Sequence, residues 1–242
     1  MNHEYRQRLK RFCRIDLARI SMNERKSMTT ISNESLRLNP EGDRPLVDPT
    51  AYVDPTAQLI GNVRIGPRVY IGPNAVIRAD EADSSMKVAP IEIGPECNIQ
   101  DGVIIHALRG AKVVVGRRSS LAHGCIVHGP CSLGEHCFVG FRATVFDAAV
   151  ADGVFISTGA IVQTVELAAH SLIPPGAAVC CQEDVTRLVS AASEEDLAFA
   201  ERVAAANLVL VDGYNSINGS NKKGGDVQTE STTHSVPSLP GA

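Results

Sequence analysis

An aliphatic residue recurs every six positions through the middle of the chain, from Val53 to about Val179. In many of these repeats a glycine follows it directly, as in Ile71-Gly72. One short repeat cannot bury a core, but repeats stacked as a parallel β-helix bury a continuous one. We expect each hexad to form one flat side ending in a tight turn, where the glycine tolerates crowding and an unusual φ. Three hexads then close a triangular coil, so the predicted fold class is mainly β, a parallel β-helix.

Two interruptions break the six-residue count. An insertion at 82–90 separates Ile77 from Ile93, and a shorter interruption near 109–112 precedes Val115. If both segments loop outward, the coil count continues unchanged on either side of them. Residues one coil apart in this count are then expected to lie next to each other.

The chain divides into three segments around this repeat. We predict a flexible, basic N-terminal extension at 1–45, a folded domain at 46–217 and a disordered, Gly/Ser/Thr-rich tail at 218–242. For the extension, a short helical arm, a partner-binding segment and a later translation start at Met22 or Met28 are the alternatives.

Helical periodicity replaces the hexads near the end of the domain. Ser193 and Asp196 have the spacing of a capping box, with Asp in place of the usual Glu or Gln. Apolar residues then recur on one helical face, and Gly213 fits a C-terminal stop. We predict a helix at about 194–212 that packs along the prism, preceded by a short helix near 184–190.

Composition excludes some classes of function. The net charge is −4 with both signs interspersed, which is not the pattern of a nucleic-acid-binding surface. No apolar run approaches the ~20 residues that a membrane span requires. The basic N-terminal segment resembles a transit peptide, but three acidic residues count against this interpretation: Glu4, Asp16 and Glu24. A cytoplasmic location is predicted, with organellar targeting as the alternative.

The cysteines follow the repeat. Cys125, Cys131 and Cys137 are six residues apart, and each lies four residues after a repeat aliphatic. Elsewhere Ala75 and Val103 occupy this position, so it accepts small apolar residues, and free Cys behaves as one. We interpret these cysteines as buried packing thiols in a reducing compartment.

Histidines are the candidate metal ligands. His106 and His128 each directly follow a repeat aliphatic, one coil apart, with Arg78 in the same column. Coils about 4.8 Å apart would let two imidazoles converge on one metal at ~2.0–2.1 Å per nitrogen. His123 lies on another side of the prism and reaches that point only from a second copy of the chain, so the count predicts a metal shared within a trimer. The alternative is that these histidines bind no metal. The remaining four are interpreted as structural or solvent-facing: His3, His136, His170 and His234.

Five stretches of the chain, within about 46–215, resemble the γ-class carbonic anhydrases. They are IRADE at 77–81, NIQDGVIIHAL at 98–108, SLAHGCIVHGP at 120–130, GFRATVF at 140–146 and NLVLVDGY at 207–214. Hexads alone occur in many acyltransferases, whereas the HAL and AHxxxxHGP motifs downstream of RADE are highly specific. The resemblance implies that the β-helix is left-handed.

The resemblance also implies a role for each matching residue. The metal ligands would be His106, His123 and His128, with His123 donated to the neighbouring subunit's site. Arg78 and Asp80 match an ion pair between subunits. The active site would also contain Glu81, a carboxylate implicated in proton transfer, Gln100, which hydrogen-bonds solvent at the metal, and Asn207, which lines the site.

The activity so implied is the reversible hydration of CO2 to bicarbonate and a proton by a homotrimer. Zn²⁺ is the expected cofactor, and Fe²⁺ or Co²⁺ would suit three imidazoles as well. Arg109 stands where archetypal members carry a proton-shuttling Glu, and the acidic loop that follows there is missing. A catalytically weak or silent scaffold is therefore one alternative. A hexapeptide acyltransferase is a less favoured one, because many acyltransferases share the hexads.

Overall fold

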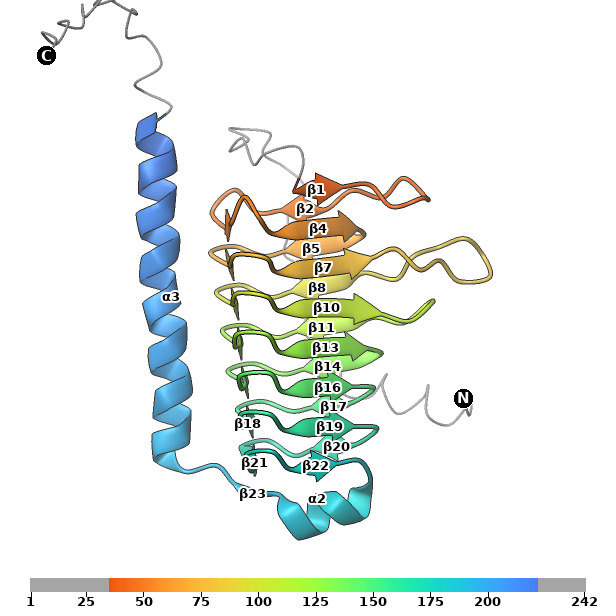
Figure 1. Cartoon of the computed structure of the whole chain (residues 1–242), viewed down its shortest axis with the longest axis vertical. Helices are drawn as coiled ribbons and strands as arrows, with labels where there is room; N and C mark the ends of the chain where they lie inside the picture. Colours follow the sequence, from red (N-terminus) through yellow and green to blue (C-terminus); the bar gives the residue numbers. More distant parts are fainter. Residues whose placement is uncertain (1–34, 222–242) are drawn as a thin grey trace, which may run out of the picture.

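The computed structural model describes residues 35–221, so the predictions for 1–34 and 222–242 lie outside the described residues. Residues 35–221 form three sheets that stack as the sides of a prism, with a long helix alongside (Figure 1). The fold class is confirmed: a mainly β chain forms a parallel β-helix of hexapeptide repeats, followed by a C-terminal helix.

Each sheet is built from strands of successive coils that pair in parallel, except that β23, which follows α2 (Gln182–Leu188), pairs antiparallel with β21. In spatial order, sheet A contains β1 (Leu36–Arg37), β4 (Gln58–Gly61), β7 (Val76–Ala79), β10 (Ile104–Ala107), β13 (Ile126–Gly129), β16 (Thr144–Phe146), β19 (Ile161–Gln163) and β22 (Ala178–Val179). Sheet B contains β2 (Leu46–Val47), β5 (Val63–Ile65), β8 (Ile91–Ile93), β11 (Val113–Val115), β14 (Cys131–Leu133), β17 (Ala149–Val150) and β20 (Glu166–Leu167). Sheet C contains β3 (Tyr52–Val53), β6 (Tyr70–Ile71), β9 (Asn98–Ile99), β12 (Ser120–Leu121), β15 (Phe138–Val139), β18 (Phe155–Ile156), β21 (Ser171–Ile173) and β23 (Ser190–Ala191).

The repeat aliphatics form the core of the prism. Ile77, Ile105 and Val127 are register partners in β7, β10 and β13, and all three are fully buried. This register continues across the insertion at 82–90 and the interruption near 109–112, so both segments loop outward as predicted.

The turns correct one expectation about glycine. The glycines that follow the aliphatic residues, such as Gly116, are absent from the positive-φ positions among the described residues. They are required by crowding, because a Cβ on Gly116 would lie 2.4 Å from the backbone of Gly134 in the next coil. The left-handed residue of these turns instead lies three positions before the next inward aliphatic, as at Asn74 (φ 57°) and Gly102 (φ 67°).

The first strand begins earlier than the repeat count indicated. Leu36 in β1 pairs with Leu59 in β4, ten residues before the predicted start of the folded domain at 46. The hexad pattern does not reveal β1, because residues 38–45 form an additional segment between β1 and β2. As a result, Leu36 and Leu59 are separated by more residues than the three hexads of a regular coil.

Two helices follow the last coils of the described chain. They are α2 (Gln182–Leu188) and α3 (Glu194–Asn221). The predicted capping box is confirmed, since Asp196 N donates to Ser193 Oγ (3.1 Å) and Ser193 N donates to Asp196 Oδ2 (2.9 Å). Neither helix is long and apolar enough to cross a membrane.

Helix α3 continues beyond the stop predicted at Gly213. The Tyr214 ring stacks on Tyr52 with centroids 4.5 Å apart, and Asn215 Nδ2 donates to Thr50 O (3.1 Å). These contacts with the prism hold the helical conformation past Gly213, where an isolated helix would lose about 1 kcal/mol relative to alanine.

The cysteines of the repeat are buried free thiols, as predicted. Cys125, Cys131 and Cys137 all lie in the aliphatic core, and so does Cys97, which lies four residues after the repeat aliphatic Ile93. Burial raises the pKa of each of these thiols to about 12. They therefore remain protonated and act as packing groups.

Candidate metal centre

The predicted column of polar residues is present on the outer face of sheet A. Arg78, His106 and His128 are register partners in β7, β10 and β13. Each directly follows a fully buried aliphatic residue, and successive side chains of a strand point to opposite faces. All three side chains therefore point away from the core.

The two histidines of this column face each other through their ring nitrogens. His106 Nδ1 lies 3.2 Å from His128 Nε2, and the rings meet edge to face with centroids 5.0 Å apart. Two nitrogens bound at 2.0–2.1 Å to one tetrahedral metal would be about 3.3 Å apart. The spacing of the two nitrogens thus fits a pair of ligands to one metal ion.

The surroundings of His106 also suit a metal ligand. Burial, followed by the positive charge of Arg78, lowers the pKa of His106 and favours its neutral form. Metal ligation requires this form. The Nε2 atom of His106 is buried with no hydrogen-bond partner within residues 35–221, and so is Asp80 Oδ1, 3.5 Å away. His128 Nδ1 lies 3.2 Å from the carbonyl oxygen of Gly129, the kind of acceptor that orients ligating histidines.

Two carboxylates border the histidine pair. Asp80 Oδ2 accepts a hydrogen bond from Arg78 Nη1 (2.9 Å) within the same chain, and an ion pair between subunits stays a prediction. Glu81 Oε1 lies 3.6 Å from His106 Nε2, while Glu81 Oε2 accepts a hydrogen bond from the backbone N–H of Arg109 (3.1 Å). We refer to Arg78, Asp80, Glu81, His106 and His128 as the sheet A cluster.

The remaining predicted site residues are associated with sheet C and form the sheet C cluster. They are Gln100, His123 and Asn207. Gln100 directly follows β9 and His123 comes two residues after β12, which pairs with β9. Asn207 lies on α3, where its Nδ2 donates to Val203 O (2.9 Å). Gln100 and Asn207 are buried polar residues, and Gln100 Oε1 has no hydrogen-bond partner in the described chain.

A single chain does not bring the three histidines together. Among residues 35–221, no group of three or more His, Cys, Asp or Glu residues is arranged to hold a metal ion. His106 and His128 belong to sheet A, whereas His123 belongs to the sheet C side of the prism. Donation of His123 to a neighbouring subunit stays a prediction.

Two further residues next to His123 were not identified from the sequence. Asp101 Oδ2 lies 3.6 Å from His123 Nδ1, and the Phe141 ring stacks on the imidazole with centroids 5.7 Å apart. Asp101, His123 and Phe141 each lie two residues after a repeat aliphatic, in successive coils. The coil count that aligned His106 with His128 would have placed these three residues in one column as well.

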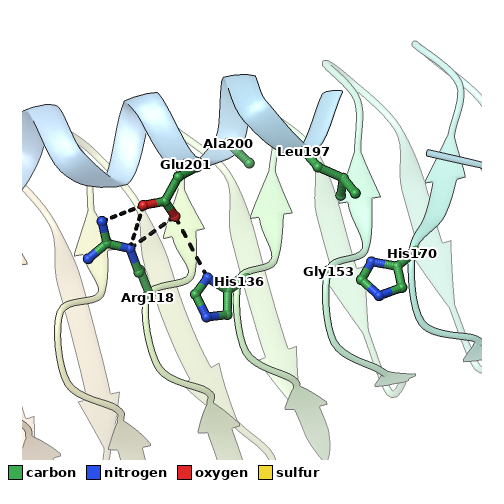
Figure 2. Close-up of a pocket in the computed structure, with 7 residues that line it drawn as sticks. All are labelled: Arg118, His136, Gly153, His170, Leu197, Ala200 and Glu201. Carbon is green, nitrogen blue, oxygen red and sulfur yellow. Dashed lines mark hydrogen bonds and ion pairs between the residues drawn. The ribbon is translucent and has the colours of Figure 1, made fainter. Parts of the chain in front are cut away.

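A separate groove lies between α3 and the prism (Figure 2). Its volume is about 160 Å³, and its lining residues are Arg118, His136, Gly153, His170, Leu197, Ala200 and Glu201. Arg118 Nε donates to Glu201 Oε1 (2.9 Å), and His136 Nδ1 lies 3.7 Å from Glu201 Oε2. The groove contains no residue of either cluster, and its ion pairs fasten α3 to the prism.

Comparison with known proteins places the chain in a family. Residues 45–79 match the family described as bacterial transferase hexapeptide (six repeats). A carbonic anhydrase of Methanosarcina thermophila is 34% identical over 198 residues, which cover 73% of this chain and 77% of that protein. The chain belongs to the γ-class carbonic anhydrase family. The family predicted from the sequence motifs is thereby confirmed.

This γ-class chain is also similar to proteins that are not named carbonic anhydrases. The carboxysome assembly protein CcmM of Synechococcus elongatus is 37% identical over 177 residues, which cover 69% of this chain. The chain spans only 32% of the length of that relative. A solved structure of a hexapeptide transferase family protein from Anaplasma phagocytophilum has a TM-score of 0.63 at 27% identity, covering 75% of this chain and 98% of that one. The γ-class carbonic anhydrase fold is thus similar to that of proteins described as transferases.

Proposed function

We propose that this chain is a metal-dependent carbonic anhydrase that reversibly hydrates CO2 to bicarbonate and a proton. Its sites would be shared between the subunits of a homotrimer. The observation that carries this proposal is the register pairing of His106 with His128, whose facing nitrogens are 3.2 Å apart. This arrangement suits two ligands of one metal and needs a third ligand from elsewhere.

The third ligand is proposed to be His123 of a neighbouring subunit. The sheet A cluster of one subunit would face the sheet C cluster of the next, so that each interface completes one site. Arg78 and Asp80 are proposed to form an ion pair that helps to organise this interface. Zn²⁺ is the expected metal, with Fe²⁺ or Co²⁺ as alternatives. When bound, the metal would act as a Lewis acid that lowers the pKa of water to near 7, for which carbonic anhydrase is itself the standard example.

The protein residues would supply orientation and proton transfer. The Glu81 carboxyl group is partly exposed and is held by the Arg109 backbone N–H, so it can accept a proton beside the metal and release it to solvent. Gln100 presents a buried oxygen that has no hydrogen-bond partner within residues 35–221, which suits it to accept a hydrogen bond from reacting water. Asn207 would line the same site, with its amide oriented by the bond to Val203 O.

Metal analysis and CO2 hydration test this proposal together. Purified full-length protein should be a trimer that binds one metal ion per interface, and the metal-loaded protein should hydrate CO2 in a stopped-flow assay. His106→Ala should lose the metal and the activity, whereas His170→Ala, which lies in the groove under α3, should keep both. A trimer that binds no metal, or a His106→Ala variant with unchanged metal content, would exclude the proposed site.

A scaffold function is the second candidate. It is favoured by the 37% identity with a carboxysome assembly protein and by Arg109 at the position of a proton-shuttling Glu. A trimer that binds metal at each interface but does not hydrate CO2 would support the scaffold. The acyltransferase alternative is favoured only by the shared fold, and acetyl-coenzyme A binding in a metal-free protein would support it.

A further inference from the structure

The imidazole of His123 lies between two side chains of its own column. Asp101 comes from the preceding coil and Phe141 from the following one. His123 Nδ1 is 3.6 Å from Asp101 Oδ2, and the His123 and Phe141 rings are nearly parallel, at 6°. The histidine is therefore bounded by a carboxylate on one side and by an aromatic face on the other.

This arrangement determines which ring nitrogen is available to a ligand. At 3.6 Å the Nδ1–Oδ2 contact is longer than a hydrogen bond, and a small ring rotation would bring it within range. An Nδ1–H directed at Asp101 leaves the lone pair of the neutral imidazole on Nε2. With Nδ1 directed at the carboxylate and the ring plane parallel to Phe141, Nε2 lies on the side of the ring away from Asp101.

A glycine in the preceding coil leaves space for the Asp101 carboxylate. A Cβ built on Gly72 would lie 2.7 Å from Asp101 Oδ1, so the absence of a side chain there makes room for the carboxylate. In addition, the Asp101 carbonyl accepts a hydrogen bond from Gly124 N (2.9 Å), which ties the Asp101 turn to the turn that follows His123. The Asp101 backbone is thus hydrogen-bonded to the following coil, and its carboxylate has room beside the preceding one.

We propose that Asp101 is a positioning residue that fixes the tautomer and orientation of His123, so that Nε2 is presented to the metal of the adjoining subunit. This inference rests on the proposed function. The carboxylate would also increase the basicity of the ligating nitrogen, as second-shell carboxylates do at zinc sites. Asp101 itself does not contact the metal or the substrate.

The test compares metal binding by Asp101→Asn, Asp101→Ala and the wild-type protein. Metal affinity is measured by competition with a chelator of known affinity, and the visible absorption of bound Co²⁺ reports the ligand geometry. Asp101→Ala should weaken metal binding about 10–100-fold and change the Co²⁺ spectrum at saturating metal. Asp101→Asn should lie nearer to the wild type, because an amide oxygen still accepts a hydrogen bond from Nδ1.

Asp212→Asn is the matched control, since it removes an exposed carboxylate that pairs with Arg68 and lies outside both clusters. It should leave the metal affinity and the Co²⁺ spectrum unchanged. The trimer mass and the melting temperature of the metal-free protein should be the same for all variants, which separates positioning from a structural defect.

Failure of this inference and failure of the proposed function give different results. If the wild-type protein binds metal and hydrates CO2 while Asp101→Ala keeps its metal affinity and its Co²⁺ spectrum, only the role of Asp101 is overturned. If Asp101→Ala weakens metal binding solely because the metal-free trimer melts earlier, the positioning role is overturned too. A wild-type trimer that binds no metal overturns both proposals.

Discussion

His106 and His128 are register partners in adjacent strands, and Nδ1 of the first lies 3.2 Å from Nε2 of the second. A parallel ladder, whose strands are about 4.8 Å apart, maintains the register of the two residues independently of any ligand. His123 lies on the sheet C side of the same rigid prism and has its own neighbours, Asp101 and Phe141. Each chain therefore carries two incomplete halves of the proposed site.

Mixing two inactive variants should restore activity if the halves belong to different subunits. His106→Ala destroys the sheet A half and His123→Ala destroys the sheet C half, so each homotrimer should lack activity. A mixed trimer contains one interface at which both intact halves meet, and random mixing should therefore restore about a quarter of the sites. Metal content and CO2 hydration after co-refolding measure this recovery.

The control for this experiment mixes His106→Ala with His128→Ala. Both substitutions lie in the sheet A half, so no interface in their mixed trimers is complete. Recovery in this control, or no recovery from His106→Ala with His123→Ala, would contradict sharing between subunits.

Glu81→Gln should slow proton release. The amide retains an oxygen that can accept the Arg109 backbone N–H bond, but it cannot accept a proton. We expect kcat in weak buffer to fall about a hundredfold, within the usual range for a proton-transfer residue, and to recover when a small diffusible base such as imidazole is added. Glu183→Gln, an exposed residue of α2, should have no effect on kcat. An unchanged kcat in Glu81→Gln would assign proton transfer to another group.

Thiol labelling should distinguish the exposed cysteines from the buried ones. In the native protein at about pH 8, Cys180 and Cys181 should react within minutes with an aromatic disulfide reagent, because both are exposed. Cys125 should not react, since a thiol with a pKa of about 12 is only about one part in ten thousand thiolate at that pH. Cys13, outside the described residues, is replaced by serine in all samples. Mass spectrometry of labelled peptides identifies the sites, and rapid labelling of Cys125 in folded protein would contradict its burial.

Lowering the pH should weaken the ion pair between Glu201 and Arg118, which joins α3 to the prism. The hydrogen bond from Arg118, followed by its positive charge, holds the pKa of Glu201 below its ordinary value of 4.5, and His136 also faces this carboxyl group. A lowered pKa in the folded state means that the stabilisation is complete above the ordinary value and is lost as pH falls through the lowered one. Because Glu201 is half exposed, the loss should stay below about 1 kcal/mol.

Urea unfolding of the wild type and Glu201→Gln at several pH values measures this loss. The wild type should have the higher free energy of unfolding near pH 7, and the difference should shrink as the pH falls through the lowered pKa of Glu201. A difference that persists at low pH would show that the charge of Glu201 is not its source.

The six-residue period carried most of the information about this fold. It predicted that Ile77, Ile105 and Val127 would align inward, and therefore that His106 and His128 would align outward. Such predictions succeed because each side of a coil has a nearly constant length and because parallel pairing allows no drift in register. A one-residue slip would expose the whole aliphatic set.

Features that depend on contacts between distant segments were harder to predict from the sequence. The end of α3 was placed near Gly213 from local propensity, whereas stacking of Tyr214 on Tyr52 extends it. The glycine after each aliphatic residue was expected to adopt an unusual φ, but it is required by the backbone of the next coil. Asp101 differs from these features, because the coil count alone places it beside His123, each of them two residues after a repeat aliphatic.

The segments at 80–90 and 108–112 leave the prism at the same corner, between sheets A and B, and both project outward from it (Figure 1). Gly110 of one segment approaches Asp83 of the other, while the strands on either side keep their register. The two segments that border His106 and His128 therefore differ from the regular coils without changing the strands that align the two histidines. The strands that align the two imidazoles thus tolerate two segments of different length and charge at this corner, and the backbone register of His106 with His128 does not depend on either.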